Sequence, residues 1–107
     1  MSKVYFTDLS SGSKEDNLIH RIEELFEKTR EGIEYDEDLI ALKLHFGEKG
    51  IDTYIRPVRV APIVDSVKKV GGTPFLSDSN TLYTGSRANA VDHHMTAQEN
   101  GWLRPVV

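Results

Sequence analysis

The sequence predicts an α/β fold: a three-layer, mostly parallel sheet of three to four strands with flanking helices, comparable to half of a Rossmann fold. Strand-like and helix-like segments alternate along the 107 residues, which is typical of parallel strands joined by right-handed crossovers. Residues 39–46 are almost continuously apolar, as expected of a strand covered on both faces. The length suits one domain, residues 1–107, with one modest core.

The first half of the chain predicts a strand, a helix and a second strand. Residues 3–8 (KVYFTD) are β-branched and aromatic and lead into a polar loop. Ser13 begins a sequence that resembles a capping box, and an apolar stripe at helical spacing runs from Leu18 to Phe26. Gly32 is the expected stop of this helix. After an acidic connector, residues 39–46 form the second strand.

The next segments predict a helix and a third strand. Pro62 is tolerated only in the first turn of a helix, so we expect this helix to begin near Arg59 or Val60. Gly71-Gly72 is expected to end it. Residues 75–78 then read as a short strand.

The last third of the chain predicts a weaker helix over residues 87–100. Its thin apolar side consists of Ala88, Val91, Met95 and Ala97. Residues 102–107 resemble the approach to a fourth strand. Because the chain ends as this strand should form, we expect a fragment or an unusually short protein.

The composition of the chain argues against several classes of function. The net charge of −4 argues against a nucleic-acid partner, which normally meets a basic face. The apolar runs are far shorter than the roughly 18 residues of a membrane span, and no signal peptide is visible, so we expect a cytoplasmic protein without a membrane partner. With no cysteine, the chain can supply neither a disulfide nor thiolates for a metal cluster.

Three polar loops should meet at one edge of such a sheet. They are residues 8–13, 45–56 and 78–87, and each follows a predicted strand. In open α/β sheets, ligands bind in the crevice outside the carboxyl ends of the strands. Each loop also leads to a helix N-terminus, whose free amides favour an anion.

The loop residues suit a small anionic ligand. Lys49, Arg56 and Arg87 can neutralise a phosphate or carboxylate. Residues that can shape the site or contact the ligand are Gly47, Gly50, Tyr54, Asp78, Asn80, Thr81, Tyr83, Gly85 and Ser86. GEKG and TGSR match neither a GxGxxG motif nor a P-loop, so solvated loops with turn glycines are the alternative.

The histidines suggest a second chemistry. His45 and Glu48 could form an acid–base pair, or His45 could be a half-buried strand residue bonded to backbone. His93 and His94 point about 100° apart on a helix and cannot easily hold one metal ion, so we expect solvated side chains and no metal site. His20 is expected at the edge of its helix.

Four blocks of the sequence resemble a known family. They are KLHFGEKG (43–50), TYIRP (53–57), GGTPFLSDSNTLYTGSR (71–87) and NAVDHH (89–94). The chain is similar to the amino-terminal part of uncharacterised prokaryotic proteins described as containing an iron–sulfur centre. The resemblance implies a redox-associated parent whose cluster cysteines lie further along longer members, so no cofactor is expected in this chain. It also covers both loop blocks around His45 and Arg87.

Three functions follow as hypotheses. The leading one is a domain that binds a small anionic molecule at the carboxyl edge of its sheet. The second is an enzyme in which His45 and Glu48 act on a substrate held by the same cations. The third is a structural or assembly domain, completed by another copy of the chain or by a missing carboxyl-terminal region.

Overall fold

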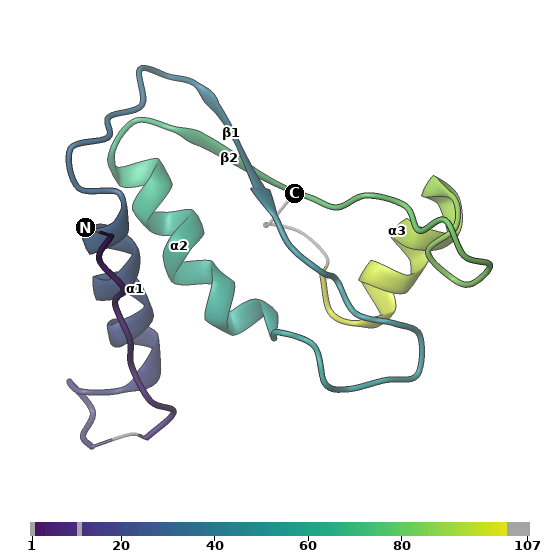
Figure 1. Ribbon diagram of the computed structural model, residues 1–107, viewed down its shortest axis with the longest axis horizontal. Helices are drawn as coiled ribbons and strands as arrows, with labels where there is room; N and C mark the ends of the chain where they lie inside the picture. The colour runs from purple at the N-terminus through teal and green to yellow at the C-terminus, as the bar shows by residue number, and fades with distance from the viewer. Residues whose placement is uncertain (1, 11, 103–107) are drawn as a thin grey trace.

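The structure is a computed structural model that describes residues 2–10 and 12–102 (Figure 1). Helices and strands alternate along the chain. They are α1 (Leu18–Thr29), β1 (Leu39–Lys43), α2 (Pro57–Lys69), β2 (Thr73–Ser77) and α3 (Ala90–Glu99). Among the described residues, none of the helices combines the length and the apolar character that a membrane span requires. The strands are parallel and helices flank them, so the predicted α/β class is confirmed.

The sheet consists of β1 and β2, and α2 is the crossover between them. The strands pair from Leu39 opposite Thr73 to Lys43 opposite Ser77. The pairing reaches one residue further, because the amide of Leu44 donates to the carbonyl of Ser77 at 3.0 Å. The two strands therefore end side by side, and the chain beyond them leads toward α3 (Figure 1).

The described residues contain two strands where three to four were predicted. Residues 3–8, the expected first strand, are extended but unpaired, and Phe6 is 85% exposed. This segment follows α1 instead of the sheet, because Oδ1 of Asp8 accepts a hydrogen bond from Arg21 of α1 at 3.1 Å. A segment with an alternating apolar pattern forms a strand only where the edge of another strand is close enough to pair with it.

One face of the sheet is open in the described part of the chain. Ile40 and Leu42 are half-buried on the face toward α2. On the opposite face, Leu39 is 75% and Phe75 38% exposed. The expectation of a strand buried on both faces is therefore wrong for these residues. The cause is the placement of α1, which packs against α2 and leaves the other face uncovered.

The helices α1 and α2 begin at residues other than the predicted ones. Asn17, not Ser13, caps α1, because its side chain accepts a hydrogen bond from the amide of His20 at 3.1 Å. α2 begins at Pro57 and keeps Pro62 within the helix. Pro57 suits the first helical position, since its missing N–H would have no helical partner there.

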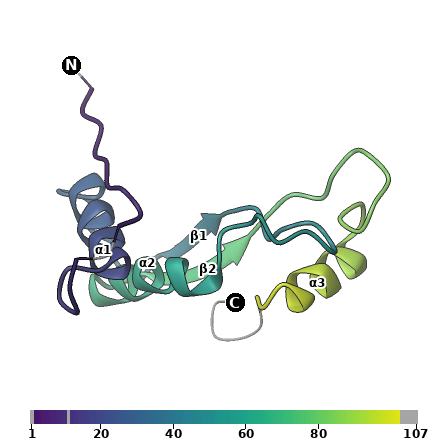
Figure 2. The same ribbon diagram turned by 90° about the horizontal axis from the view of Figure 1, so that it is seen from below.

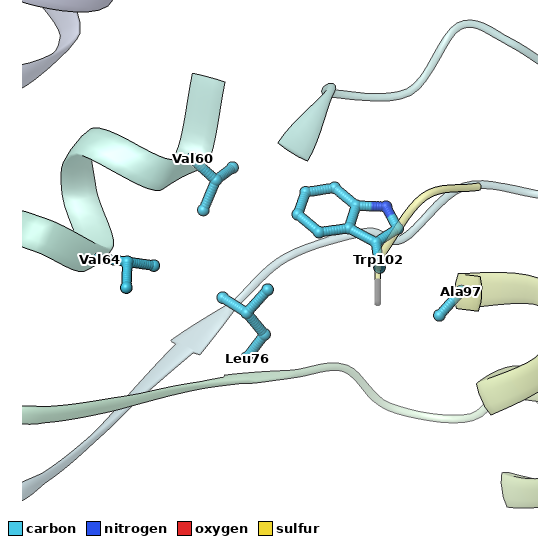
Figure 3. Close-up of a cluster of buried hydrophobic side chains, with 5 residues drawn as sticks. All are labelled: Val60, Val64, Leu76, Ala97 and Trp102. Atoms are coloured by element: carbon cyan, nitrogen blue, oxygen red, sulfur yellow. The ribbon is translucent and has the colours of Figure 1, made fainter. Parts of the chain in front are cut away.

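The core lies between α2, β2 and the segment after α3 (Figure 3). Its buried apolar side chains are Val60, Val64, Leu76, Ala97 and Trp102. Trp102 is 2% exposed, and its indole Nε1 donates to the carbonyl of Phe46 at 3.0 Å. The chain after α3 thus returns to the loop that follows β1. The rest of the predicted fourth strand, residues 103–107, lies outside the described residues.

The end of α3 fixes the loop after β1. Asn100 Nδ2 donates to the carbonyl of Phe46 at 3.0 Å, the same oxygen that accepts from the indole. The hydroxyl of Tyr54 donates to the carbonyl of Asn100 at 3.1 Å. Gly47 has φ +96°, and a Cβ there would lie 2.6 Å from Asn100 Nδ2, so this position requires glycine.

Gly72 allows the start of β2 to approach α2 and β1 closely, and its replacement tests this packing. A Cβ at Gly72 would lie 2.7 Å from Val67 Cγ1 and 3.0 Å from Ile40 Cγ1. We expect Gly72→Ala to lower the free energy of unfolding in urea by about 1–3 kcal/mol, because such crowding forces side chains off their rotamers. Gly85→Ala, where the nearest atom would be 3.8 Å away, is the control. Equal stability of the two variants would contradict the close packing.

Candidate functional site

Two of the three polar loops predicted to converge do meet. Residues 45–56 follow β1, residues 78–87 follow β2, and their side chains are joined by hydrogen bonds at the carboxyl end of the sheet. The described residues of the third loop, 8–13, lie beside α1, at the opposite end of the molecule from α3 (Figures 1 and 2). No strand precedes this loop in the structure, so nothing carries it to the sheet edge.

Arg87 joins the two loops through a pair of carboxylates. Its side chain is only 7% exposed, its Nη1 donates to Oε1 of Glu48, and its Nη2 lies 3.2 Å from Oδ2 of Asp78. Burial alone would lower the pKa of Arg87, but the two carboxylates outweigh it and raise that pKa above its ordinary value. The sequence predicted Arg87 as an anion contact. In the structure its charge is already balanced by the protein.

Glu48 is held ionised by two donors. The hydroxyl of Tyr83 donates to Oε1 at 2.6 Å, and Arg87 donates to the same oxygen. The hydrogen bond from Tyr83, followed by that from Arg87, lowers the pKa of Glu48, and the same bond to Glu48 raises the pKa of Tyr83. A carboxyl group with a lowered pKa carries no proton to donate near neutral pH, which makes Glu48 a poor general acid.

His45 uses its ring nitrogens inside the protein. Nδ1 accepts a hydrogen bond from the amide of Gly47 at 2.9 Å. Nε2 is 2.8 Å from Nη1 of Arg87, which can only donate and which also contacts Glu48 and Tyr83. Both ring nitrogens therefore face N–H groups of the protein. This geometry favours the alternative of a strand histidine bonded to the backbone over an acid–base pair with Glu48.

Asp78 is a buried carboxylate at the end of β2. Its side chain is 6% exposed, Oδ1 accepts from the amide of Ser79 at 2.8 Å, and Nζ of Lys43 lies 3.5 Å from the same oxygen. Burial would raise the pKa of Asp78, but the Ser79 amide and Arg87 outweigh it and leave the pKa below its ordinary value. Asp78 is therefore ionised and paired.

His93 is a candidate site residue that the sequence interpretation missed. It was expected in solvent, yet it is 6% exposed, with its ring edge-on to Phe46 at 5.9 Å between centroids. Nδ1 lies 3.0 Å from Oδ1 of Asn80, and Nε2 lies 3.4 Å from Oδ2 of Asp78 without a hydrogen-bond partner. His94, one residue on, is exposed but lines the same cavity as His93.

The buried side of α3 differs from the predicted one. Val91 and Met95, expected to face the core, are 70% and 55% exposed, whereas His93, Thr96 and Ala97 are buried. The helix also begins at Ala90 rather than at residue 87, after the cap Asn89, whose side chain accepts from the amide of Asp92 at 3.0 Å. The signal available in the sequence was the spacing of His93, Thr96 and Ala97 on one helical face.

A cavity of about 230 Å³ lies between the end of β2 and the first turn of α3. Phe46, Leu76 and Ala97 form its apolar wall, and Asp78, Asn80 and His93 its polar wall. Ala90, the first residue of α3, also lines it. The cavity therefore occupies the position at which open α/β sheets bind their ligands.

Lys49 and Arg56, the other two cations predicted to hold the ligand, lie in different environments. Nζ of Lys49 is exposed and 4.0 Å from Glu99. Arg56 stacks on the ring of Tyr54, with 4.6 Å between the guanidinium carbon and the ring centroid, and donates to the Tyr54 hydroxyl at 2.8 Å. In the described structure, Lys49, Arg56 and Arg87 each have a different partner and do not form one cluster.

The remaining predicted site residues shape the loops. They are Gly47, Gly50, Thr81, Gly85 and Ser86. The amide of Thr81 donates to the carbonyl of Arg87 at 2.9 Å, which closes the second loop. The carbonyl of Ser86 accepts from the hydroxyl of Thr96 at 3.0 Å, which anchors the loop to α3.

The residues present do not fit an iron–sulfur cluster. The chain contains no cysteine, and within the described ranges no group of three or more histidine, aspartate or glutamate side chains could hold a metal ion. The iron–sulfur association implied by the family resemblance therefore stays a hypothesis about longer relatives.

Comparison with known proteins gives one match. The family described as "Domain of unknown function (DUF362)" matches residues 40–106, which include both loops and α3. No curated protein and no solved structure matches the chain. The match thus assigns a family without assigning an activity.

Replacement of Arg87 tests its role as the tie between the loops. We expect Arg87→Gln to lower the free energy of unfolding by about 3–5 kcal/mol, because it leaves the buried Asp78 carboxylate and its neighbour Glu48 without their counter-charge. Arg87→Lys should lose less, since it keeps the charge. Arg59→Gln, at an exposed position of α2, is the control and should stay within about 0.5 kcal/mol of the wild type in urea denaturation. A wild-type stability for Arg87→Gln would overturn this role.

Proposed function

We propose that this chain, which belongs to the family described as "Domain of unknown function (DUF362)", binds a small anionic molecule at the carboxyl edge of its sheet. The observation that carries the proposal is the cavity at the first turn of α3, into which the buried His93 presents an unpartnered ring nitrogen. A buried polar atom without a partner indicates a missing ligand or water.

The N-terminus of α3 supports an anion as the ligand. Within the residues that the structure describes, the amides of Ala90 and Val91 have no acceptor. Free amides and the positive end of the helix dipole together favour a negative charge. α3 has ten residues, so its dipole is developed.

The charges around the cavity permit an anion. Arg87 and Lys43 are positive, and Asp78 and Glu48 are negative, so the four side chains balance. The first turn of α3 also carries the carboxylate of Asp92, which accepts a hydrogen bond from Nδ2 of Asn89 at 2.8 Å and lines a different pocket from this cavity. Among the cations expected to hold the ligand, Arg87 serves instead to fix the loops that form the cavity.

The enzyme hypothesis receives less support. Glu48 is ionised by its donors, and the Nδ1 lone pair of His45 is occupied by a backbone amide. A carboxylate with a lowered pKa is a weak general base, and the bound amide directs the His45 lone pair at Nδ1 away from a substrate.

Removal of a single amide tests the anion proposal. Ala90→Pro deletes the amide hydrogen at the first helical position, where proline is well accepted, and Asn89 before it already has the extended backbone (φ −140°, ψ 163°) that precedes proline. We expect the affinity for inorganic phosphate, measured by calorimetry, to fall by about 10- to 100-fold, because a hydrogen bond to a charged group is lost.

Ala90→Ser, which keeps the amide, is the control for this experiment and should bind phosphate like the wild type. The proposal fails if the wild type does not bind phosphate or sulfate. It fails equally if Ala90→Pro binds phosphate as tightly as Ala90→Ser does.

A second candidate function, an assembly domain completed by another copy of the chain, is supported by the open face of the sheet. Parallel sheets are normally covered on both faces. On the open face Leu39 is 75% and Phe75 38% exposed, and a second copy of the chain would cover these apolar side chains.

Sedimentation tests the assembly function. The assembly function predicts that the wild-type chain is a dimer. Phe75→Glu, on the open face, should convert this dimer to a monomer, because the charge would be buried in the interface. Val58→Glu, on an exposed position of α2, is the control and should leave the dimer intact. A wild-type chain that sediments as a monomer at high concentration would exclude this function.

A further inference from the structure

The hydrogen bonds of His93 determine where its proton lies. Nδ1 is 3.0 Å from Oδ1 of Asn80, and an amide oxygen can only accept, so Nδ1 carries the proton. Burial lowers the pKa of His93, and although Asp78 raises it, the net shift is downward, so the ring is neutral at pH 7. A neutral imidazole with its proton on Nδ1 presents a lone pair at Nε2.

The atom nearest to this lone pair is a second acceptor. Nε2 lies 3.4 Å from Oδ2 of Asp78, and both side chains are more than nine-tenths buried. Oδ2 receives a hydrogen bond from Arg87. With the proton of the ring on Nδ1, neither Oδ2 nor Nε2 can donate to the other. Two buried acceptors face each other, an arrangement that a hydrogen-bond donor entering the cavity would stabilise.

The donor is better supplied by a hydroxyl than by an ammonium group. Asp78, the carboxylate that lines the cavity, is already paired with Arg87 and Lys43, and the positive end of α3 disfavours a cation. The cavity of about 230 Å³ is also smaller than the roughly 300–1,000 Å³ pockets of drug-sized ligands, which limits the ligand to a few carbons.

We propose that the ligand is a small hydroxylated oxyanion, whose anionic group meets the first turn of α3 and whose hydroxyl donates to Nε2 of His93 beside Asp78. This inference rests on the proposed anion-binding function and adds the class of ligand. Phosphate and carboxylate compounds share this chemistry: a three-carbon hydroxyalkyl phosphate and a hydroxy acid of similar size both fit it.

Matched pairs of ligands test the hydroxyl contact. We expect glycerol 1-phosphate to bind the wild-type chain about tenfold more tightly than n-propyl phosphate, because only the former donates to Nε2. Glycerate and propionate form the corresponding carboxylate pair, and the pair that binds more tightly identifies the anionic group. His93→Phe keeps the aromatic packing against Phe46 and removes the acceptor, so it should abolish the preference for the hydroxylated member.

A spectroscopic readout on the wild type covers the case in which His93→Phe does not fold. The ¹⁵N resonance of His93 Nε2 should shift on addition of glycerol 1-phosphate and stay in place with n-propyl phosphate. Equal affinities within both pairs, with binding retained, would overturn the hydroxyl contact and leave the anion proposal intact. Absence of binding by all four compounds would overturn both. A hydroxyl preference that survives in His93→Phe would exclude His93 as the acceptor.

Discussion

The guanidinium of Arg87 is the contact on which the arrangement of the sheet edge depends. It lies in the second loop and reaches Glu48 in the first loop and Asp78 at the end of β2. A buried cation with two carboxylates is stable only while all three groups remain in place, since each would otherwise be an uncompensated charge. The geometry of the loops is therefore fixed by electrostatics as much as by the small apolar core, which is built largely from valine, alanine and leucine around one tryptophan.

This arrangement changes which groups are available for recognition. The arginine that appeared most suited to hold an anion is paired with the protein's own carboxylates, so the proposed recognition would rest on backbone amides and a neutral histidine. Such groups distinguish ligands by the direction of hydrogen bonds more than by charge.

The elements of the fold that depend on the spacing of apolar residues within one segment were predicted from the sequence. Apolar spacing and glycine predict the crossover helix α2 and its end before Gly71. Apolar spacing also predicts the strand at residues 39–43. Residues 3–8 have the same kind of pattern as a strand, but a strand also needs a neighbouring edge, which the sequence does not specify. The spacing of His93, Thr96 and Ala97 indicates the buried face of α3, but the polar partners of His93 could not be predicted, because Asn80 and Asp78 lie 13 and 15 residues away across a loop. Likewise, Lys49, Arg56 and Arg87 share a charge, but their separate partners are set by tertiary contacts.

The carbonyl of Phe46, which accepts from both Asn100 and Trp102, has a consequence for the order of folding. Its two donors lie 54 and 56 residues further along the chain, so the loop after β1 cannot reach its final shape until the segment beyond α3 has docked. Contacts of such separation close late and slow the folding of a small domain. During synthesis, β1 and α2 would leave the ribosome well before this loop is ordered. The backbone amides around the cavity should accordingly be the last in the domain to become protected from hydrogen exchange. They should also be the first to lose that protection when the segment beyond α3 detaches.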